Sequence, residues 1–312
     1  MKTIATLTVN PAIDKNTRVE QVMPDRKLRC QRPRREPGGG GVNVSRAIHR
    51  LGGESMAYYL AGGPMGDILE GLLEEEGLTQ RRLPMEDWTR ENLHAYEESS
   101  GQQYRFGMPG PEVREEEWRG CIQVLEELDP APEYVVASGS LSPGIPDDFY
   151  SRLGQALGAN GTRLVVDTSG EALRRLTGAG AFLIKPNTRE LQELAGRELA
   201  DEDEQVEAAR QAMAEDCCTV VALSLERGGT VVITEDDVEF VRAPTVRIRS
   251  KVGAGDSMVA GVVLGLARDM ELMEAIRFGV AAAAAAVMTE GTELCRRVDT
   301  ERLFARMHEG AK

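Results

Sequence analysis

One short stretch of the sequence combines the residue types that a phosphate transfer needs. Gly253, Ala254 and Gly255 are followed directly by Asp256, and an apolar helical pattern begins at Met258. Two glycines at the start of a helix allow successive backbone N–H groups to point into one concavity, where the helix dipole favours an anion. A bound phosphate would repel a carboxylate beside it, so Asp256 indicates a general base that accepts a proton from an attacking hydroxyl.

The same stretch also has a purely structural interpretation. In that case Asp256 or Ser257 caps the helix and the glycines turn the chain. The β-branched run at residues 245–248 predicts a strand before the turn, so the expected unit is strand, tight turn and helix. The remaining segments decide between the two interpretations.

Composition and charge bound the class of protein. Of the 312 residues, 41% are hydrophobic and 28% charged, as in globular proteins with one large core. Five cysteines without a C-x-x-C pair, and only three histidines, disfavour a disulfide framework and a zinc site and favour a reducing cytoplasm. The net charge of −14 disfavours nucleic-acid binding, and no apolar run is long enough to span a membrane. Residues 1–35 nevertheless hold nine Lys or Arg against three acids, which suits a small anionic substrate or a solvated basic loop.

Short apolar runs alternate with amphipathic helices through most of the chain. Strand patterns lie at residues 57–60, 134–137, 163–166, 182–184, 219–224 and 230–233, and helix patterns at 66–76, 115–128, 148–157 and 188–194. This alternation predicts a largely parallel sheet that is covered by helices on both faces.

Two polar segments lack a helix between their strand patterns. Lys27 and Arg29 alternate within residues 18–35 and so would share one face of a strand, and Arg105 lies between two aromatic residues in a second alternating run. We expect these segments to form a small β lid. A sheet of about four short strands has little to pack against, so we also expect a homodimer in which two lids cover each other.

Polar residues and glycines at strand ends are candidates for ligand binding. Asp14 could accept two sugar hydroxyls, or it could belong to a turn. The glycines at 38–41, which include Gly39 and Gly40, permit close approach of the backbone to a ligand and let the lid pivot. Asn43 could donate to a sugar or phosphate oxygen, or it could serve only to start a helix. Neither a dinucleotide-binding fingerprint nor a P-loop occurs.

A second loop at a strand end joins candidate phosphate and metal ligands. Lys185 and Asn187 could contact nucleotide phosphates, and Glu190 could hold Mg²⁺ directly or through water. The spacing of Asn187 and Glu190 is also that of a capping box, which is the favoured interpretation of this segment in isolation. Residues 138–144, which include Gly139, are similarly open between a ligand loop and a simple turn.

Six motifs occur in one order along the chain. They are Asn10-Pro11 with Asp14, the glycine quartet with Asn43, Ser138-Gly139-Ser140, Asp167-Thr168-Ser169-Gly170, Lys185-Pro186-Asn187 with Glu190, and Gly253-Ala254-Gly255-Asp256-Ser257. This order resembles the PfkB branch of the ribokinase family over nearly the whole chain. Residues 27–30, 88–94 and 103–106 are similar to the 6-phosphofructokinase members of that branch.

The resemblance implies a fold and an activity. The fold would be a ribokinase-like three-layer α/β/α core made of residues 1–11, 36–86 and 110–312, with residues 12–35 and 87–109 as a β-sheet lid that forms the dimer. The activity would be transfer of phosphate from ATP, with Mg²⁺, to the 1-hydroxyl of fructose 6-phosphate, which yields fructose 1,6-bisphosphate in glycolysis.

The resemblance also implies roles for individual residues. Asp256 would be the base, and the anion hole would be shaped by Gly253, Ala254 and Gly255. The sugar phosphate would be bound by Asp14, Lys27, Gly39, Gly40, Asn43, Arg90, Arg105 and Gly139. ATP would contact Lys185, Asn187, Ser224 and Gly229, with Glu190 on Mg²⁺. A monovalent cation such as K⁺ would bind near Ser250, Val252, Ala286, Thr289 and Gly291. Glu226 stands where the family usually has a small residue beside the nucleotide, and its carboxylate would repel phosphate.

Three alternatives remain. A tagatose-6-phosphate kinase or a 1-phosphofructokinase would use the same scaffold, because a phosphate at either end of a ketohexose could meet the two arginines. A non-catalytic sugar-phosphate sensor of the same fold is a more remote alternative, which the joint presence of Asp256, Lys185 and Glu190 disfavours. A nicotinamide-dependent dehydrogenase is disfavoured by the missing fingerprint.

Overall fold

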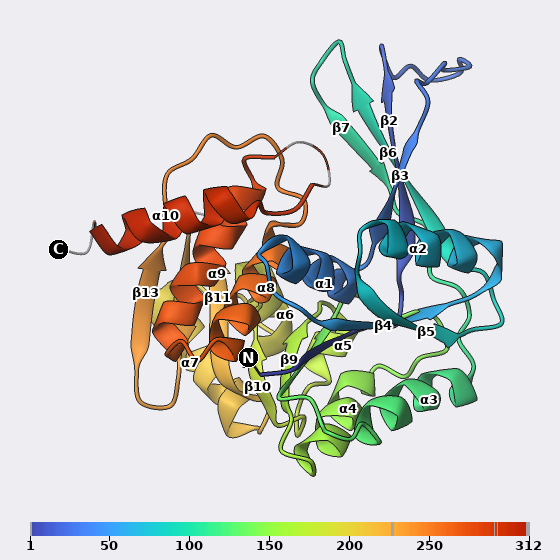
Figure 1. Cartoon of the computed structure of the whole chain (residues 1–312). Helices are drawn as coiled ribbons and strands as arrows, with labels where there is room; N and C mark the ends of the chain where they lie inside the picture. Colours follow the sequence, from blue (N-terminus) through green and yellow to red (C-terminus); the bar gives the residue numbers. More distant parts are fainter. Residues whose placement is uncertain (1, 226–227, 290, 292, 310–312) are drawn as a thin grey trace.

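The central element of the structure is a nine-stranded sheet. The computed structural model describes residues 2–225, 228–289, 291 and 293–309. The strands of this sheet are β1 (Ile4–Thr8), β4 (Met56–Ala61), β5 (Thr79–Pro84), β8 (Tyr134–Ser138), β9 (Arg163–Asp167), β10 (Ala181–Ile184), β11 (Cys218–Leu225), β12 (Gly229–Ile233) and β13 (Val238–Arg242). They lie in the order β13-β12-β11-β10-β9-β8-β1-β4-β5, and β12 runs antiparallel to both of its neighbours, whereas the other adjacent pairs are parallel. Figure 1 shows this sheet at the centre of the molecule.

Helices cover both faces of this sheet. One face carries α3 (Glu115–Glu126), α4 (Phe149–Gly158), α5 (Glu171–Arg174), α6 (Thr188–Ala195) and α7 (Glu202–Ala214), and the other carries α1 (Gly40–Arg50), α8 (Ala254–Ala267), α9 (Leu272–Ala286) and α10 (Arg297–Glu309). Alternate side chains of β1 enter separate cores, since Leu7 joins the first cluster of helices and Ile4 the second. The predicted three-layer arrangement is therefore confirmed. Within the described ranges no helix is both long and apolar enough to cross a bilayer.

A smaller sheet extends away from the core (Figure 1). Its strands are β2 (Ala12–Val19), β3 (Arg34–Gly38), β6 (Arg90–Glu97) and β7 (Gln103–Phe106), in the order β3-β2-β6-β7. The base of this lid sheet packs on α2 (Gly63–Glu75), where Ile13 meets Leu69 and Leu73 in a small buried cluster. The expected β lid is present, and it is assembled from two separate stretches of the sequence.

The structure contradicts two details of the strand prediction. Residues 245–248 form no strand: β13 ends at Arg242 as the last strand of the sheet, and the run beyond Pro244 pairs with no described strand. Lys27 and Arg29 do not share a strand either. The chain turns at residues 24–26, where Asp25 has a φ of 56°, and β3 begins only at Arg34. The other strand and helix patterns coincide with elements of the structure within a few residues.

Two glycines bring α8 and α9 into close contact. A Cβ added to Gly261 would lie 2.7 Å from Cα of Gly279, and one added to Gly279 would lie 2.7 Å from the carbonyl oxygen of Met258. The backbones therefore approach more closely than any side chain permits. This contact fixes the position of α8, which carries Asp256 in its first turn.

We predict that Gly261→Val destabilises the protein by about 1–3 kcal/mol, because the added methyl groups force the two helices apart. Gly71→Ala is the control. Gly71 lies inside α2 with no atom within 4 Å of the added Cβ, so the change is expected to stabilise by roughly 0.5–1 kcal/mol. Urea unfolding of the three proteins measures both effects, and an unchanged midpoint for Gly261→Val would contradict the close contact.

Candidate active site

The first turn of α8 places a carboxylate at the carboxyl ends of the parallel strands. Gly253 precedes the helix with a left-handed φ of 71°, a conformation that glycine adopts without strain. Asp256 then accepts a hydrogen bond of 2.9 Å from Nδ2 of Asn43 on α1. Burial of its carboxyl group and, second, the charge of Asp167 raise the pKa of Asp256 to about 7, although Asn43, Lys185 and Arg46 act in the opposite direction. The site therefore holds a carboxyl group that can exchange a proton near neutral pH.

A buried lysine lies beside the glycines of this turn. Nζ of Lys185, at the end of β10, is 3.2 Å from a carboxylate oxygen of Asp167, at the end of β9. Burial would lower the pKa of Lys185, but the negative charges of Asp167 and Glu190 outweigh burial and raise it. A Cβ on Gly255 would lie 3.5 Å from that Nζ. The lysine therefore stays charged next to the predicted anion hole at residues 253–255. No separate role for Asp167 is predicted from the sequence, although a carboxylate at the end of a strand pattern is a candidate for a place in the site.

Two glycine-containing turns meet at the edge of the same site. Gly39 has a φ of 114° and Gly139 one of 119°, values that favour glycine. A Cβ on Gly40 would collide with Oγ of Ser138 and approach the backbone nitrogen of Gly139 to 2.8 Å. Because α1 begins at Gly40, the glycine quartet forms the start of the helix as well as the connection from the lid. The structure thus brings Gly39, Gly40, Gly139 and Asn43 together.

The lid sheet presents one polar face to the core. Cross-strand pairing places Asp14 opposite Asn92, whose Nδ2 donates to it at 2.8 Å, and places Arg105 opposite His94 on the same face. Burial lowers the pKa of His94, and the charge of Arg105 adds to that effect. Lys27, in contrast, is exposed on the loop between β2 and β3 and is not part of the strands that carry Arg90 and Arg105.

Arg90 occupies the base of the lid next to Asp14. Its guanidinium donates to the carbonyl oxygens of Met108 at 2.9 Å and Asn10 at 3.1 Å, whereas Nε is buried without a protein partner in the part of the chain that the structure describes. Burial lowers the pKa of Arg90, and Asp14 opposes this shift. A buried donor without an acceptor is costly, so an anionic ligand at this position would satisfy it.

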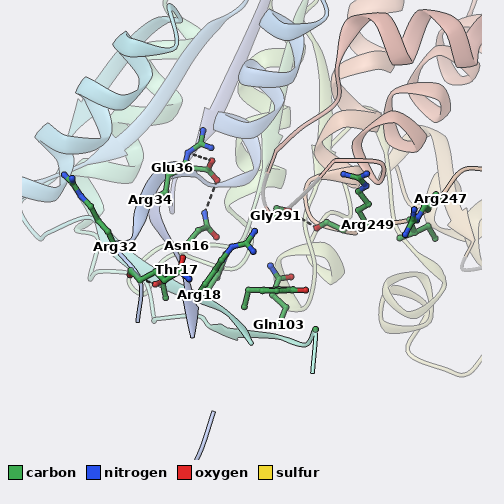
Figure 2. A pocket seen from close by; sticks show the side chains of 16 residues that line it. Asn16, Thr17, Arg18, Arg32, Arg34, Glu36, Gln103, Arg247, Arg249 and Gly291 are labelled. Atoms are coloured by element: carbon green, nitrogen blue, oxygen red, sulfur yellow. Dashed lines mark hydrogen bonds and ion pairs between the residues drawn. The ribbon is translucent and has the colours of Figure 1, made fainter. Parts of the chain in front are cut away.

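A cleft of about 760 Å³ separates this polar face from the core loop at residues 247–250 (Figure 2). Its lining is rich in arginine, with Arg18, Arg32 and Arg34 from the lid side and Arg247 and Arg249 from the core side. Asp256 and Lys185 do not line it, so the cleft lies beside the reacting groups rather than around them. The concentration of positive charge favours anions in this cleft.

The predicted nucleotide residues form a separate group at the ends of β10 and β11. Asn187 caps α6 and exchanges two hydrogen bonds with Glu190, of 2.8 and 2.9 Å, so the capping-box interpretation of this segment is confirmed. Ser224 lies next to Asn187 in an isolated bridge, and Gly229 begins β12. Burial raises the pKa of Glu190. Glu226 lies outside the described residues.

The residues predicted to bind a monovalent cation lie in two adjoining segments, the loop before α8 and the end of α9 with the loop that follows it, which are joined by hydrogen bonds from the backbone N–H groups of Arg249 and Ser250 to the carbonyl oxygen of Val287. Oγ of Ser250 donates to the carbonyl oxygen of Gly291 at 2.7 Å and accepts from the backbone N–H of Val252 at 3.2 Å. Oγ1 of Thr289 donates to the carbonyl oxygen of Ala286 at 2.7 Å. The structure therefore brings this set together. No cluster of three His, Cys, Asp or Glu side chains suitable for a metal occurs within the described ranges.

Comparison with known proteins gives a consistent result over the whole chain. The family model "pfkB family carbohydrate kinase" matches residues 7–299. An ATP-dependent 6-phosphofructokinase isozyme 2 of Escherichia coli K12 is 42% identical, covering 98% of this chain and 99% of the relative. A 1-phosphofructokinase of Bacillus subtilis is 32% identical, covering 93% of this chain and 95% of the relative.

Solved structures agree with these relatives. Phosphofructokinase-2 of Escherichia coli in complex with potassium superposes with a TM-score of 0.94 at 40% identity, covering 99% of this chain and all of that one. The same enzyme gives TM-scores of 0.91 with fructose 6-phosphate and 0.92 as a tetrameric inhibited form, at the same identity and coverage. A ribokinase of Arabidopsis thaliana, 17% identical, shares the fold with a TM-score of 0.75 and 97% coverage of this chain and 98% of that one.

The raised pKa of Asp256 predicts a pH-dependent cost to folding. The unfolded chain releases this proton near pH 3.8, whereas the folded protein keeps it up to about pH 7. Stability is therefore lost as the pH rises through that interval, and no more is lost above it. We expect the stability of Asp256→Asn relative to the native protein to increase by on the order of 4 kcal/mol between pH 4 and pH 8. Urea unfolding at both pH values measures this, and a constant difference would contradict the raised pKa.

Proposed function

The chain belongs to the pfkB family of carbohydrate kinases, and we propose that it transfers the terminal phosphate of ATP to the 1-hydroxyl of fructose 6-phosphate. The observation that carries this proposal is the carboxyl group of Asp256, which has a pKa of about 7 in the first turn of a glycine-initiated helix. The more similar of the two curated relatives bears the name of this activity.

Asp256 supplies the proton acceptor of the proposed reaction. A base is most effective when its pKa lies near the working pH, because it is then both deprotonated and able to hold the proton. In this proposal the 1-hydroxyl of the sugar approaches Asp256, and its oxygen attacks the terminal phosphorus as the proton passes to the carboxylate. The bond from phosphorus to the bridging oxygen of ADP breaks. The N–H groups of Gly253, Ala254 and Gly255 would receive the oxygens of the migrating group.

The lid and the turns beside it would hold the sugar phosphate. In this proposal the sugar contacts Asp14, Asn43, Gly39, Gly40 and Gly139, and its distant phosphate contacts Arg90 and Arg105. The unpaired Nε of Arg90 supports this assignment, because a phosphate oxygen would complete its hydrogen bonding. Lys27 stays a prediction as a phosphate ligand.

The nucleotide would lie against Lys185, Asn187, Ser224 and Gly229. Lys185 remains charged although it is buried, which suits a residue that accompanies the migrating phosphate. Mg²⁺ would neutralise charge on the phosphates of ATP. Glu190 fits this ion as a ligand through water, because its cap on α6 is then kept, and an ion held mainly by phosphates needs few protein carboxylates. Ser250, Val252, Ala286, Thr289 and Gly291 would hold K⁺.

The lid would also form the dimer. We propose the division given above, with residues 12–35 and 87–109 as lid and the remainder as core. Trp88, Phe106 and Met108 are exposed large hydrophobic residues on or beside the lid, and they offer apolar surface for a second copy. Sedimentation equilibrium tests this assembly, and a monomer at micromolar concentration would contradict it. The cytoplasmic setting stays a prediction.

A substrate panel tests the proposed activity. With ATP and Mg²⁺, we expect ADP formation with the highest kcat/KM for fructose 6-phosphate, ahead of fructose 1-phosphate and tagatose 6-phosphate. Free fructose is expected to be poor, because Arg90 would keep an unpaired donor. A different order among the three phosphosugars would favour one of the related kinases. Absence of ADP formation with all of them would favour the sugar-phosphate sensor.

Asp256→Asn tests the role of the base. We predict that turnover falls by about 10² to 10⁴-fold while binding of ATP and fructose 6-phosphate persists, because the amide cannot accept the proton but keeps the shape of the side chain. Steady-state kinetics and calorimetric binding separate the two quantities. Asp203→Asn, at an exposed position in the first turn of α7, is the matched control and should leave turnover unchanged. Near-native turnover of Asp256→Asn would refute the assigned role.

A further inference from the structure

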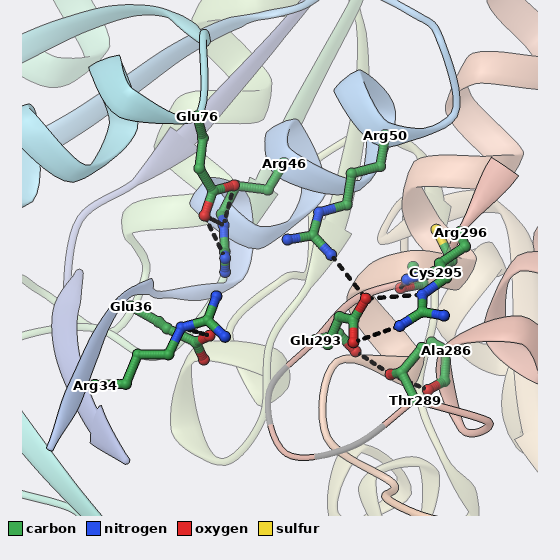
Figure 3. A network of polar contacts seen from close by, with 11 residues as sticks. Arg34, Glu36, Arg46, Arg50, Glu76, Ala286, Thr289, Glu293, Cys295 and Arg296 are labelled. Carbon is green, nitrogen blue, oxygen red and sulfur yellow. Dashed lines mark hydrogen bonds and ion pairs between the residues drawn. The ribbon is translucent and has the colours of Figure 1, made fainter. Parts of the chain in front are cut away.

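A chain of polar contacts leads from Asp256 through α1 to Glu76, which is partly exposed. Asn43 donates through Nδ2 to Asp256 and accepts through Oδ1 from Nη1 of Arg46 at 3.1 Å. Arg46 in turn makes a paired contact with Glu76, of 2.9 Å from Nε and 2.6 Å from Nη2 (Figure 3). The chain therefore joins the first turn of α8, the first two turns of α1 and the residue that follows α2.

The donor and acceptor capacities of these groups permit one orientation of the Asn43 amide. A guanidinium only donates hydrogen bonds and stays charged in proteins, whereas an ionised carboxylate only accepts them. The Asn43 amide lies between the two, so its oxygen must face Arg46 and its nitrogen must face Asp256. A rotation of 180° would set oxygen against carboxylate and NH₂ against guanidinium, and both hydrogen bonds would be lost.

Arg46 is itself held firmly. Its side chain is 2% exposed, and Nη1 also donates to the carbonyl oxygen of Pro37 in β3 at 3.0 Å. Burial alone would raise the pKa of Glu76, but the hydrogen bonds and charge of Arg46 outweigh burial and keep that pKa below its ordinary value. The pair is therefore ionised, and the bidentate contact with Glu76 fixes the plane of the Arg46 guanidinium.

We propose that Arg46 and Glu76 are positioning residues, which hold the Asn43 amide with its NH₂ group toward Asp256 and so maintain that carboxylate as the proton acceptor. The inference rests on the proposed function, since it gives these two residues a task in the same reaction. Neither residue touches the substrates in this assignment. Their effect passes through Asn43.

The charges around Asp256 give the direction of the effect. Asp167 faces it from β9 and disfavours its ionised form, whereas Lys185 from β10 and the Asn43 and Arg46 pair from α1 favour it. Loss of Arg46 would remove one positive charge and release the Asn43 amide. Two of the three favourable contributions would weaken together, so protonated Asp256 would persist to higher pH.

The test replaces the whole ion pair. Arg46→Met combined with Glu76→Met avoids a buried unpaired charge, because replacement of both partners by apolar residues of similar size is tolerated. We expect the acid limb of kcat/KM against pH to move upward by about one pH unit, the shift that loss of one hydrogen bond to a charged group produces. At pH 7 this corresponds to a roughly fivefold loss of kcat/KM.

Two further variants separate positioning from general damage. Glu76→Gln keeps the positive charge of Arg46 but loses part of the bidentate contact that holds it, so the midpoint should rise by less than in the double variant. Arg82→Met removes another arginine of this region, which pairs with Asp67 and Glu70 but has no contact with Asn43 among the described interactions, and should leave the midpoint unchanged. A native midpoint in the double variant, or an equal rise in Arg82→Met, would overturn the proposal.

A measurement without substrate distinguishes failure of this inference from failure of the proposed function. The carboxyl carbon of Asp256 can be titrated by ¹³C NMR in the full chain, with the signal assigned by its loss in Asp256→Asn. We expect the same upward shift of about one pH unit in the double variant. If the native protein fails to phosphorylate fructose 6-phosphate, the proposed function fails, yet the titration still supports or contradicts the positioning role.

If the double variant does not fold, Arg46→Lys replaces it. We then expect a smaller upward shift of the Asp256 titration, because the positive charge is kept, and no shift would overturn the proposal.

Discussion

The site depends on the burial of one carboxylate that must nevertheless give up its proton. Water stabilises an ionised acid far better than a protein interior does, so the fold must supply donors in place of solvent. Around Asp256 these are the Asn43 amide and, at longer range, the charges of Lys185 and Arg46. These donors and charges offset only part of the effect of burial, so the pKa of Asp256 stays at about 7. A group that takes up and returns a proton needs a pKa near the working pH.

The parallel sheet brings the groups around Asp256 together. Its strands end at a common edge, so Asp167, Lys185 and the turn at Gly139 reach the same place from three separate parts of the sequence. The helix that carries Asp256 points its first turn at this edge, and α1 contributes Asn43 from the same side. The lid sheet adds Asp14, Arg90 and Arg105, which the core itself does not provide.

The sequence predicted most of this arrangement because its signals were local. Apolar periodicity located the core strands and helices, and glycine-containing turns located Gly39, Gly139 and Gly253. The failures were of two physical kinds. Residues 245–248 have strand-forming composition but no partner, since pairing is decided by neighbours in space. The pair of Arg46 and Glu76 is separated by 30 residues, and only the packed structure brings them together. The spacing of Asn43 and Arg46, one helical turn apart, was the only local sign of it.

The contact between Gly261 and Gly279 has a consequence for motion. At Gly261 and Gly279 the two backbones meet without a side chain from either residue between them, and the side chains around this contact are buried in one core, so a shift of α8 would disrupt that packing. Asp256, the proposed proton acceptor, therefore lies on a helix that is closely packed in the core. In the proposed reaction, the rearrangement that admits the sugar and releases the product would then fall to the four-stranded sheet, which joins the core through the glycines that precede α1.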